Sequence, residues 1–291
     1  MTVSEGSTSA PAAATPARSN LWMRVAAALV LVPAALLTTY LGGWIYALFW
    51  TAASAAILYE WTTLVGGRDT RLGFWLSFIA GLLGLIAALL LGLYLERVGV
   101  AILLIGLGGL GAAIFAPAER RGWMFAGVLY AGALLLGTLL LRADPMLGFV
   151  AMLLLFAVVW ATDIAGYFVG RAIGGPKLAP RISPGKTWSG AIGGVVFAIA
   201  AALGVAVFAR LPSVAPVVVI AVALSVVAQA GDLMESGIKR RFHAKDAGTL
   251  IPGHGGVMDR LDGFWAAVLL AVCIGLMRGG LDDPARGLLL W

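Results

Sequence analysis

The sequence predicts an all-α polytopic membrane protein with about nine transmembrane helices. Of its 291 residues, 61% are hydrophobic and only 12% are charged, and the mean hydropathy is +0.99. A water-soluble globule of this length has no core large enough to hide so much apolar surface. The single cysteine, Cys273, lies in an apolar run and excludes an internal disulfide framework.

The N-terminal residues 1–20 are rich in Ser, Thr, Ala and Pro without an apolar period, so we expect a flexible cytoplasmic tail. The apolar run that follows is too long for a signal peptide and leads directly into a second one. Nine apolar segments each come near the roughly 20 residues that span a bilayer core as a helix. They cover residues 21–41, 43–65, 72–95, 98–117, 122–142, 146–170, 188–210, 213–235 and 261–278.

Two polar connections between these segments are long, 171–187 and 236–261. Because two spans separate them, they should emerge on the same face of the membrane. They divide the chain into N-terminal transmembrane helices, 21–145, and a C-terminal transmembrane region, 146–291, in which we expect the chemistry to lie.

The distribution of Lys and Arg predicts the orientation, because these residues accumulate on the cytoplasmic side of a membrane. The side that holds the N-terminus and both long connections receives 15 of the 20 Lys and Arg residues, and the other side receives 5. The N-terminus is therefore predicted to be cytoplasmic and the C-terminus external. This topology explains the pI near 9.8 without a nucleic-acid partner. Basic connections beside headgroups suit an anionic lipid or a nucleotide.

Two short patterns resemble nucleotide-binding motifs but lack the structural context of these motifs. Gly106-Leu-Gly-Gly-Leu-Gly111 fits the dinucleotide fingerprint, yet it lies inside an apolar span with no preceding strand. Close helix packing is the better interpretation. Pro184-Gly-Lys-Thr187 resembles the end of a P-loop, but Pro180 stands where the first glycine belongs. The sequence therefore predicts neither a Rossmann nor a Walker fold.

Charged residues gather in the C-terminal region. The 31 residues from Asp232 to Asp262 carry five basic and five acidic side chains. Asp163 stands apart from them within an apolar helix, where a carboxylate is costly unless it is paired or bound to a cation. Both a functional role and a structural ion pair are open for Asp163.

Asp232 and Glu235 fall in the expected last turn of the eighth span, where the helix dipole disfavours negative charge. Each acid therefore needs a cation. Lys239 follows Glu235 by four residues and is the simple partner for it. A metal ion is the sharper candidate for Asp232. Asp259 is less decisive alone, because an acid at the start of the ninth helix is favoured by the dipole in any case.

A glycine-rich turn, Pro252-Gly-His-Gly-Gly256, lies between these acids. Its glycines leave backbone N–H groups free to approach an anion. His254 either hydrogen-bonds a phosphate or fixes the turn. Mg²⁺ commonly uses one or two carboxylates plus substrate phosphates, and bases neutralise the charge of a leaving group. Acids, bases and such a turn at a membrane surface together suggest phosphoryl or nucleotidyl transfer.

Two blocks of the sequence resemble the phosphatidate cytidylyltransferase (CDP-diacylglycerol synthase) family. The longer block reads Ser236-x-x-Lys239-Arg240-x4-Lys245-Asp246-x-Gly248-x2-Ile251-Pro252-Gly253-His254-Gly255-Gly256-x-x-Asp259-Arg260-x-Asp262. The other contains Trp160-Ala-Thr-Asp163, then Gly170-Arg171 and Lys177-Leu-Ala-Pro180-Arg-Ile-Ser183-Pro184-Gly185-Lys186-Thr187-Trp188. The resemblance is strong over about residues 150–280. It implies transfer of a cytidylyl group from CTP to phosphatidic acid, giving CDP-diacylglycerol and pyrophosphate in phospholipid biosynthesis.

The resemblance also implies which residues act, and it makes 146–291 the catalytic transmembrane region. The implied catalytic residues are Asp163, Lys186, Asp232, Lys239, Asp246, Asp259 and Arg260. The implied substrate-binding residues are Ser183, Thr187, Arg240, His254, Gly255 and Gly256. Asp232 and Asp259 are assigned to the metal, and Lys186, Lys239 and Arg240 to phosphates.

The same resemblance implies Mg²⁺ as the cofactor, with Mn²⁺ able to substitute and room for an additional monovalent cation. The expected partners are CTP, phosphatidic acid and the lipid bilayer, without nucleic acid. The glycine run Gly166-x-x-x-Gly170 would permit close helix packing within one chain or across a homodimer. We expect an integral protein of the bacterial cytoplasmic (inner) membrane with its active site facing the cytoplasm.

Two other functions compete with this one. A transporter would place functional charges near the bilayer midplane and carry an internal repeat, but the charges gather at one face and no repeat is visible. A CDP-alcohol phosphatidyltransferase would need several aspartates in one Asp-Gly-x-x-Ala-Arg type block, and Asp262-Gly-Phe-Trp-Ala266 does not continue in that way.

Overall fold

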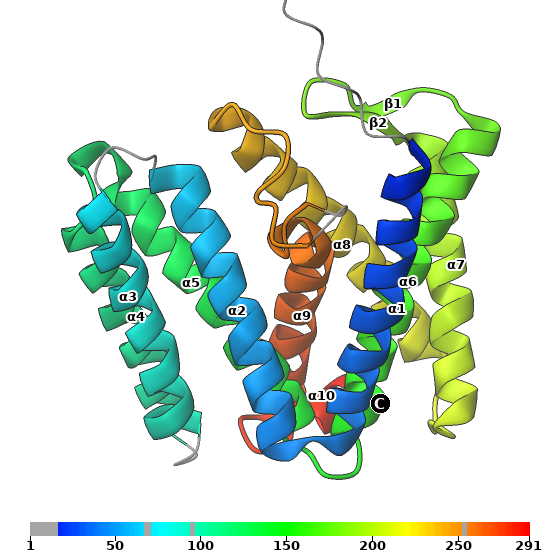
Figure 1. Ribbon diagram of the computed structural model, residues 1–291. Coiled ribbons are helices and arrows are strands. Elements are labelled where there is room, and N and C mark those ends of the chain that lie inside the picture. Colours follow the sequence, from blue (N-terminus) through cyan, green and yellow to red (C-terminus); the bar gives the residue numbers. More distant parts are fainter. Residues whose placement is uncertain (1–16, 67–70, 94–96, 252–254) are drawn as a thin grey trace, which may run out of the picture.

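The computed structural model of the chain describes residues 17–66, 71–93, 97–251 and 255–291, which form a bundle of helices with one short hairpin (Figure 1). The α-helices are α1 Ala17–Leu41, α2 Gly43–Gly66, α3 Arg71–Ala87, α4 Val98–Ile114, α5 Arg121–Arg142, α6 Gly148–Ile173, α7 Trp188–Phe208, α8 Ala215–Arg241, α9 Met258–Gly279 and α10 Pro284–Leu289. A π-helical segment, η1 Ala88–Leu93, continues α3, and a 3-10 turn, η2 Ala118–Arg120, precedes α5. Strand β1, Lys177–Ala179, pairs antiparallel with β2, Ser183–Thr187.

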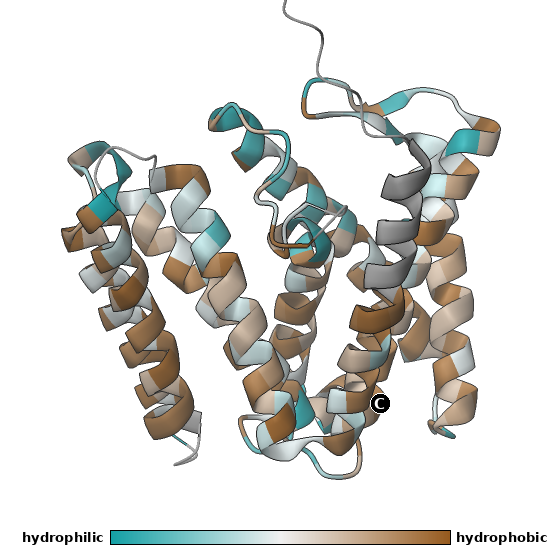
Figure 2. Ribbon diagram, viewed as in Figure 1, coloured by the Kyte–Doolittle hydropathy of each residue, from teal (hydrophilic) through white to brown (hydrophobic). Residues whose placement is uncertain are grey.

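Six helical stretches in the described part of the chain are long and apolar enough to cross a membrane. They are Arg71–Gly92, Ala118–Arg142, Gly148–Ile173, Trp188–Phe208, Ala215–Arg241 and Met258–Gly279. Apolar residues dominate the bodies of the helices, and hydrophilic residues gather at their upper ends (Figure 2). The prediction of an all-α polytopic membrane protein is confirmed. The count of nine spans and the orientation of the two ends stay predictions.

Several elements begin or end elsewhere than the sequence predicts. Helix α1 begins at Ala17, inside the segment expected to be a tail, of which residues 1–16 lie outside the described part. Helix α8 continues to Arg241, because Lys239, Arg240 and Arg241 form a last turn that the helix dipole favours. Asp232 and Glu235 therefore lie before the last turn and not in it. Helix α9 begins at Met258, and the connection 171–187 contains the β1–β2 hairpin.

Glycines set the closest contacts between helices. A Cβ atom on Gly108 of α4 would lie 2.7 Å from Cα of Gly84 in α3, so the fingerprint-like run of α4 serves helix packing as predicted. A Cβ atom on Gly170 of α6 would lie 2.8 Å from Thr187 Oγ1 and 3.3 Å from Cα of Gly190 in α7. The close packing at Gly166-x-x-x-Gly170 therefore occurs within the chain, between α6 and α7.

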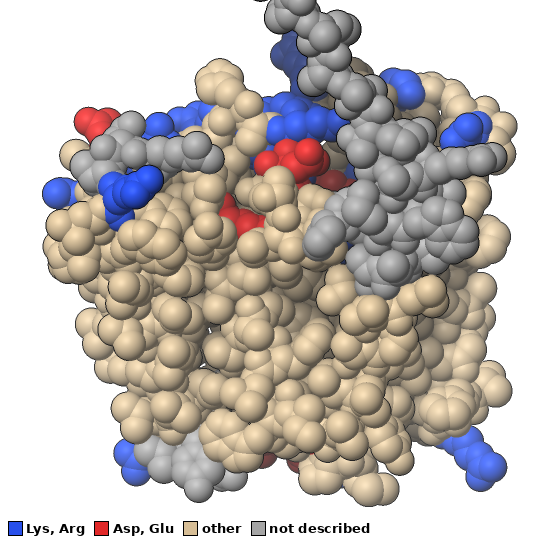
Figure 3. Space-filling view, in the orientation of Figure 1, with Lys and Arg blue, Asp and Glu red and all other residues tan. Residues whose placement is uncertain are grey.

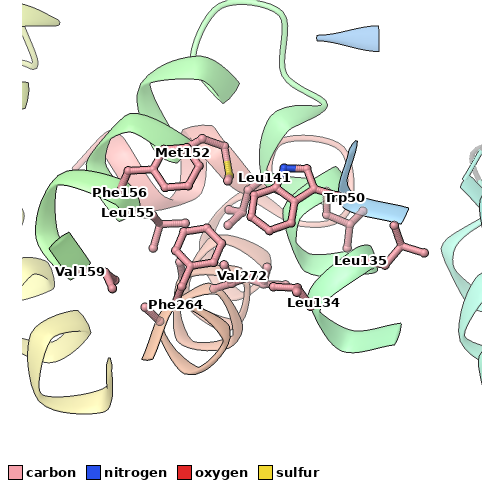
Figure 4. Packing of buried hydrophobic residues seen from close by; sticks show 14 of the residues in the cluster. Trp50, Leu134, Leu135, Leu141, Met152, Leu155, Phe156, Val159, Phe264 and Val272 are labelled. Atoms are coloured by element: carbon pink, nitrogen blue, oxygen red, sulfur yellow. The ribbon is translucent and has the colours of Figure 1, made fainter. Parts of the chain in front are cut away.

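An aromatic stack connects the N-terminal helices to the C-terminal region (Figure 4). The ring of Trp50 in α2 lies 5.2 Å from that of Phe264 in α9, which lies 5.1 Å from Phe156 in α6. All three side chains are buried. Helices α2, α6 and α9 thus share one core. This core holds the upper ends of the three helices in place, at the end of the bundle where hydrophilic residues gather (Figure 2), which we call the polar end. The hairpin and the α8–α9 connection both lie at this end, and the C-terminus lies at the other (Figure 1).

Candidate functional site

Acidic side chains gather in a hollow at the polar end of the bundle, with Lys and Arg beside them (Figure 3). The charged residues here belong to α6, β2, α8 and α9 and to the connection between the last two helices. They form two groups, one around Asp232 and the other around Lys239.

The first group is built on an ion pair between Lys186 of β2 and Asp232 of α8. The two side chains are 27% and 28% exposed. Ser236, one turn further along α8, donates its hydroxyl to Asp232 Oδ1 at 3.4 Å. Lys186 is therefore the cation that Asp232 needs in this structure. Because solvent reaches the pair, either charge can exchange its partner for a phosphate or a metal ion.

Asp163 of α6 belongs to the same group. Its carboxylate interacts electrostatically with Asp262, Asp232, Lys186 and Arg260, and its side chain is exposed. Asp163, Asp232 and Asp262 are thus close enough to repel one another, and Lys186 and Arg260 offset part of the negative charge of Asp163. In the described part of the chain, no group of three or more Asp, Glu, His or Cys side chains is arranged to hold a metal ion. A metal here would need oxygens from a substrate as well.

The second group surrounds Lys239, which is buried. Its ammonium group lies 3.1 Å from Glu235 Oε2 and 2.6 Å from Asp259 Oδ1. The pairing of Glu235 with Lys239 is thus confirmed. Asp259 also accepts hydrogen bonds from the N–H of Ala247 at 2.9 Å and of Gly256 at 2.8 Å. The carboxylate of Asp259 therefore holds the connection between α8 and α9 in place.

Glu60 of α2 reaches this connection from the N-terminal half of the chain. Its two oxygens accept hydrogen bonds from the N–H of Val257 at 2.9 Å and of Met258 at 2.8 Å, at the start of α9. The side chain is fully buried. A Cβ atom on Gly248 or Gly256 would lie 2.6 or 2.5 Å from these oxygens, so a side chain at either position would displace the Glu60 carboxylate. Glu60 and Asp259 together shape the turn before α9.

The glycine-rich turn is only partly described, and His254 lies outside the described residues. Gly255 has a φ of +86°, which favours glycine, and its carbonyl accepts a hydrogen bond from Ile251 N–H at 2.9 Å. The N–H of Gly256 donates to Asp259. A carboxylate of the chain therefore occupies a donor that the sequence analysis leaves for an external anion.

The other expected site residues have simpler surroundings. Thr187 is buried at the start of α7, where its hydroxyl accepts a hydrogen bond from Gly190 N–H at 3.1 Å and caps the helix. Ser183 is half-buried in β2. Arg240 is exposed and donates to the carbonyl of Ala244 at 3.1 Å, and Asp246 is also exposed. The structure thus brings Asp163, Lys186 and Asp232 together and leaves Arg240 and Asp246 at the surface.

A sequence model of the cytidylyltransferase family matches residues 22–277. The chain belongs to this family. The phosphatidate cytidylyltransferases of Brucella suis and Brucella melitensis are each 46% identical to it over 270 residues, which cover 92% of this chain and 97% of each relative. The phosphatidate cytidylyltransferase of Bacillus subtilis is 46% identical over 108 residues, 37% of this chain and 40% of the relative. The family resemblance of the two sequence blocks is confirmed.

The match to the family includes α2, and Glu60 is a residue that the sequence analysis misses. In the sequence, Glu60 lies inside the predicted apolar segment 43–65. The available signal is the carboxylate itself, because an acid inside an apolar span is costly unless it has partners. In this family member the partners are backbone N–H groups of the α8–α9 connection.

Proposed function

We propose that this family member transfers the cytidylyl group of CTP to phosphatidic acid, giving CDP-diacylglycerol and pyrophosphate in phospholipid biosynthesis. The observation that carries the proposal is the partly exposed Lys186–Asp232 pair, with Asp163 and Arg260 near it, at the polar end of an apolar bundle. The full-length relatives are named phosphatidate cytidylyltransferases. A membrane-embedded lipid and a water-soluble nucleotide can meet at such an end.

In this reaction an oxygen of the lipid phosphate forms a bond to the α-phosphorus of CTP. The bond from that phosphorus to the oxygen shared with the β-phosphate breaks, and pyrophosphate leaves with the electron pair. No nucleophile from the protein is required. The chain contributes positive charge and position, which dominate catalysis of such transfers. Lys186 can move its ammonium from Asp232 to a triphosphate oxygen without crossing an apolar barrier, because the pair is open to solvent.

The carboxylates around Asp232 fit a magnesium ion that also binds substrate phosphates, with Mn²⁺ as a substitute. When bound, Mg²⁺ neutralises phosphate charge. Asp232 suits this role, because its side chain is 28% exposed and its carboxylate accepts from only Lys186 and Ser236 in the described part of the chain. Asp259 already accepts from Lys239, Ala247 and Gly256, so it joins the metal only when one of these donors releases it. An additional monovalent cation would offset the repulsion between the carboxylates of Asp163 and Asp262.

The same proposal places the protein in the bacterial cytoplasmic membrane, with the site and both polar connections facing the cytoplasm. The 15-to-5 distribution of Lys and Arg supports this orientation. A periplasmic reporter fused after Trp291 should be active, and a cytoplasmic reporter inserted at Gly175 should be active as well. The opposite pattern would reverse the orientation. A homodimer would need a surface other than Gly166 and Gly170, which pack against α7.

The decisive experiment incubates the purified protein with labelled CTP, phosphatidic acid and Mg²⁺. We expect a lipid-soluble cytidine product, together with one equivalent of pyrophosphate. Reactions without phosphatidic acid, and reactions with the Asp232→Asn variant, are the matched controls. A correctly folded protein that releases pyrophosphate without a lipid product, or that leaves CTP intact, would contradict the proposal.

A further inference from the structure

A second open cavity, of about 510 Å³, lies at the polar end of the bundle. Its walls come from the end of α2, from η2, from the start of α5 and from the C-terminal end of α8. The polar and aromatic residues that line it are Glu119, Arg120, Trp123, Arg241, Phe242 and His243. Arg241 follows Lys239 by two residues, so it projects from nearly the opposite face of α8. This cavity is therefore separate from the groups around Asp232 and Lys239.

Two aromatic rings in edge-to-face contact form one wall of the cavity, and each lies close to one of the two arginines. The rings of Trp123 and Phe242 meet edge to face at 5.1 Å. The guanidinium of Arg120 lies 5.3 Å from the Phe242 ring, and that of Arg241 lies 5.6 Å from the Trp123 ring. A guanidinium that lies over a ring keeps its N–H edges for acceptors in its own plane. Both arginines are thus oriented without losing most of their donors.

The cavity has an excess of positive charge. It contains two arginines and one glutamate, and His243 adds a further donor. Among the described residues, neither arginine has a carboxylate within 4.0 Å, because the ion pairs found there all involve Lys186 or Lys239. Arg120 also donates to the carbonyl of Val65, which fixes it to the end of α2. Two guanidinium groups with N–H donors available recognise an oxyanion such as a phosphate.

His243 is held at the rim of the cavity by the backbone. It has a φ of +56°, in the left-handed region that non-glycine residues seldom adopt. Its N–H donates to the carbonyl of Arg240 at 3.2 Å, which closes the end of α8. The N–H of Ala244 also donates to the carbonyl of Lys239 at 2.9 Å, so this conformation is a common helix end, and it leaves the His243 side chain at the rim of the cavity.

We propose that this cavity binds the phosphate of an anionic lipid headgroup, with the guanidinium groups of Arg120 and Arg241 as its donors. Inorganic phosphate shares this chemistry, but the wall of Trp123 and Phe242 matches the apolar part of a lipid. Aromatic and basic residues at the ends of apolar helices lie at the level of the headgroups. Because Arg241 and Phe242 lie two and three residues after Lys239, the bound lipid anchors the end of α8 whose Lys239 pairs with Asp259.

The test measures lipid binding by the full-length protein and does not depend on its enzymatic activity. The protein is placed in nanodiscs of phosphatidylcholine, and phosphatidylglycerol is titrated in while the bound lipid is counted by native mass spectrometry. Phosphatidylglycerol is chosen because its phosphodiester is not the substrate of the proposed reaction. We expect the wild-type protein to retain phosphatidylglycerol in preference to phosphatidylcholine, and Arg241→Gln to weaken this retention by about tenfold.

Three further variants isolate the cavity. Arg121→Gln removes an exposed arginine next to Arg120 that does not line the cavity, and it should bind as the wild type does. Lys186→Gln should also retain the lipid, which separates this site from the one at Asp232. His243→Gln should weaken binding several-fold, and it serves as the test if Arg241→Gln does not fold. Undiminished binding in a folded cavity variant, equal loss in Arg121→Gln, or saturation by inorganic phosphate alone would overturn the proposal.

Discussion

Lys186 and Lys239 lie at the same end of the molecule, and each forms an ion pair with an aspartate. Their surroundings are nevertheless opposite. The side chains of Lys186 and Asp232 are 27% and 28% exposed, and they join a hairpin to a helix. Those of Lys239, Glu235 and Asp259 are 11%, 0% and 7% exposed, and they join two helices. The family resemblance implies that both lysines bind substrate phosphates, and only the structure separates them.

The difference in exposure gives the Lys186–Asp232 pair and the Lys239 group different roles. An exposed ion pair contributes about 0–1 kcal/mol to stability, so its charges can leave one another at little cost. Breaking a buried pair by removing one partner costs about 3–5 kcal/mol, because a charge is left without compensation. The Lys186–Asp232 pair is therefore suited to exchange partners during a reaction. The Lys239 group is suited to hold the α8–α9 connection.

The largest effect should follow the Lys239→Met change. It leaves Glu235 and Asp259 buried beside one another without a cation, so stability should fall by about 3–5 kcal/mol. Thermal unfolding of the purified protein in detergent measures this loss. Lys245→Met, at an exposed lysine of the same connection, is the matched control and should leave the melting temperature nearly unchanged. If Lys239→Met has the melting temperature of the wild type, Lys239 does not have the structural role that distinguishes it from Lys186.

Asp232→Asn and Lys186→Gln should instead lower turnover strongly and change stability little. Each variant removes a charge that faces the substrates, so turnover should fall by at least about a hundredfold. The melting temperature should change little, because the pair is open to solvent. Steady-state kinetics over a range of Mg²⁺ and CTP concentrations, on protein with a checked melting temperature, gives the result. Near-normal turnover at low Mg²⁺ in Asp232→Asn would exclude Asp232 as a principal metal ligand.

Glu60→Gln should lower both stability and turnover, each by less than the changes above. The amide has one oxygen, so one of the N–H groups of Val257 and Met258 loses its acceptor, at a cost of about 1–3 kcal/mol. Turnover should fall by about tenfold, because the same connection positions Asp259. Glu60→Asp keeps both oxygens and should recover part of the activity. A fall in stability without any change in turnover would make Glu60 a purely structural residue.

The sequence predicts the polar blocks because charges are rare on this apolar background, and it predicts the Glu235–Lys239 pair from its helical spacing. It does not predict the contact of Glu60 with Val257, because no periodicity relates residues 197 positions apart. It also misplaces the end of α8, because hydropathy drops before the helix stops. The surroundings of Asp259 depend on backbone N–H groups, and local patterns do not show where these point.

The smallest effect should come from Lys186→Arg, which keeps the charge and changes its shape. If Lys186 only anchored the hairpin to Asp232, arginine would replace it without loss, since its fork pairs well with a carboxylate. A point charge that must move from Asp232 to a triphosphate should suffer, because the planar guanidinium holds the carboxylate through two bonds and releases it less readily. We expect the KM for CTP or the turnover number to worsen by a few-fold to tenfold, with membrane insertion unchanged. Arg181→Lys, the reverse exchange at an exposed position of the same hairpin, is the control and should leave both constants unchanged. Wild-type kinetics in Lys186→Arg together with near-normal turnover in Lys186→Gln would reduce Lys186 to an anchor and leave the phosphates to other basic residues.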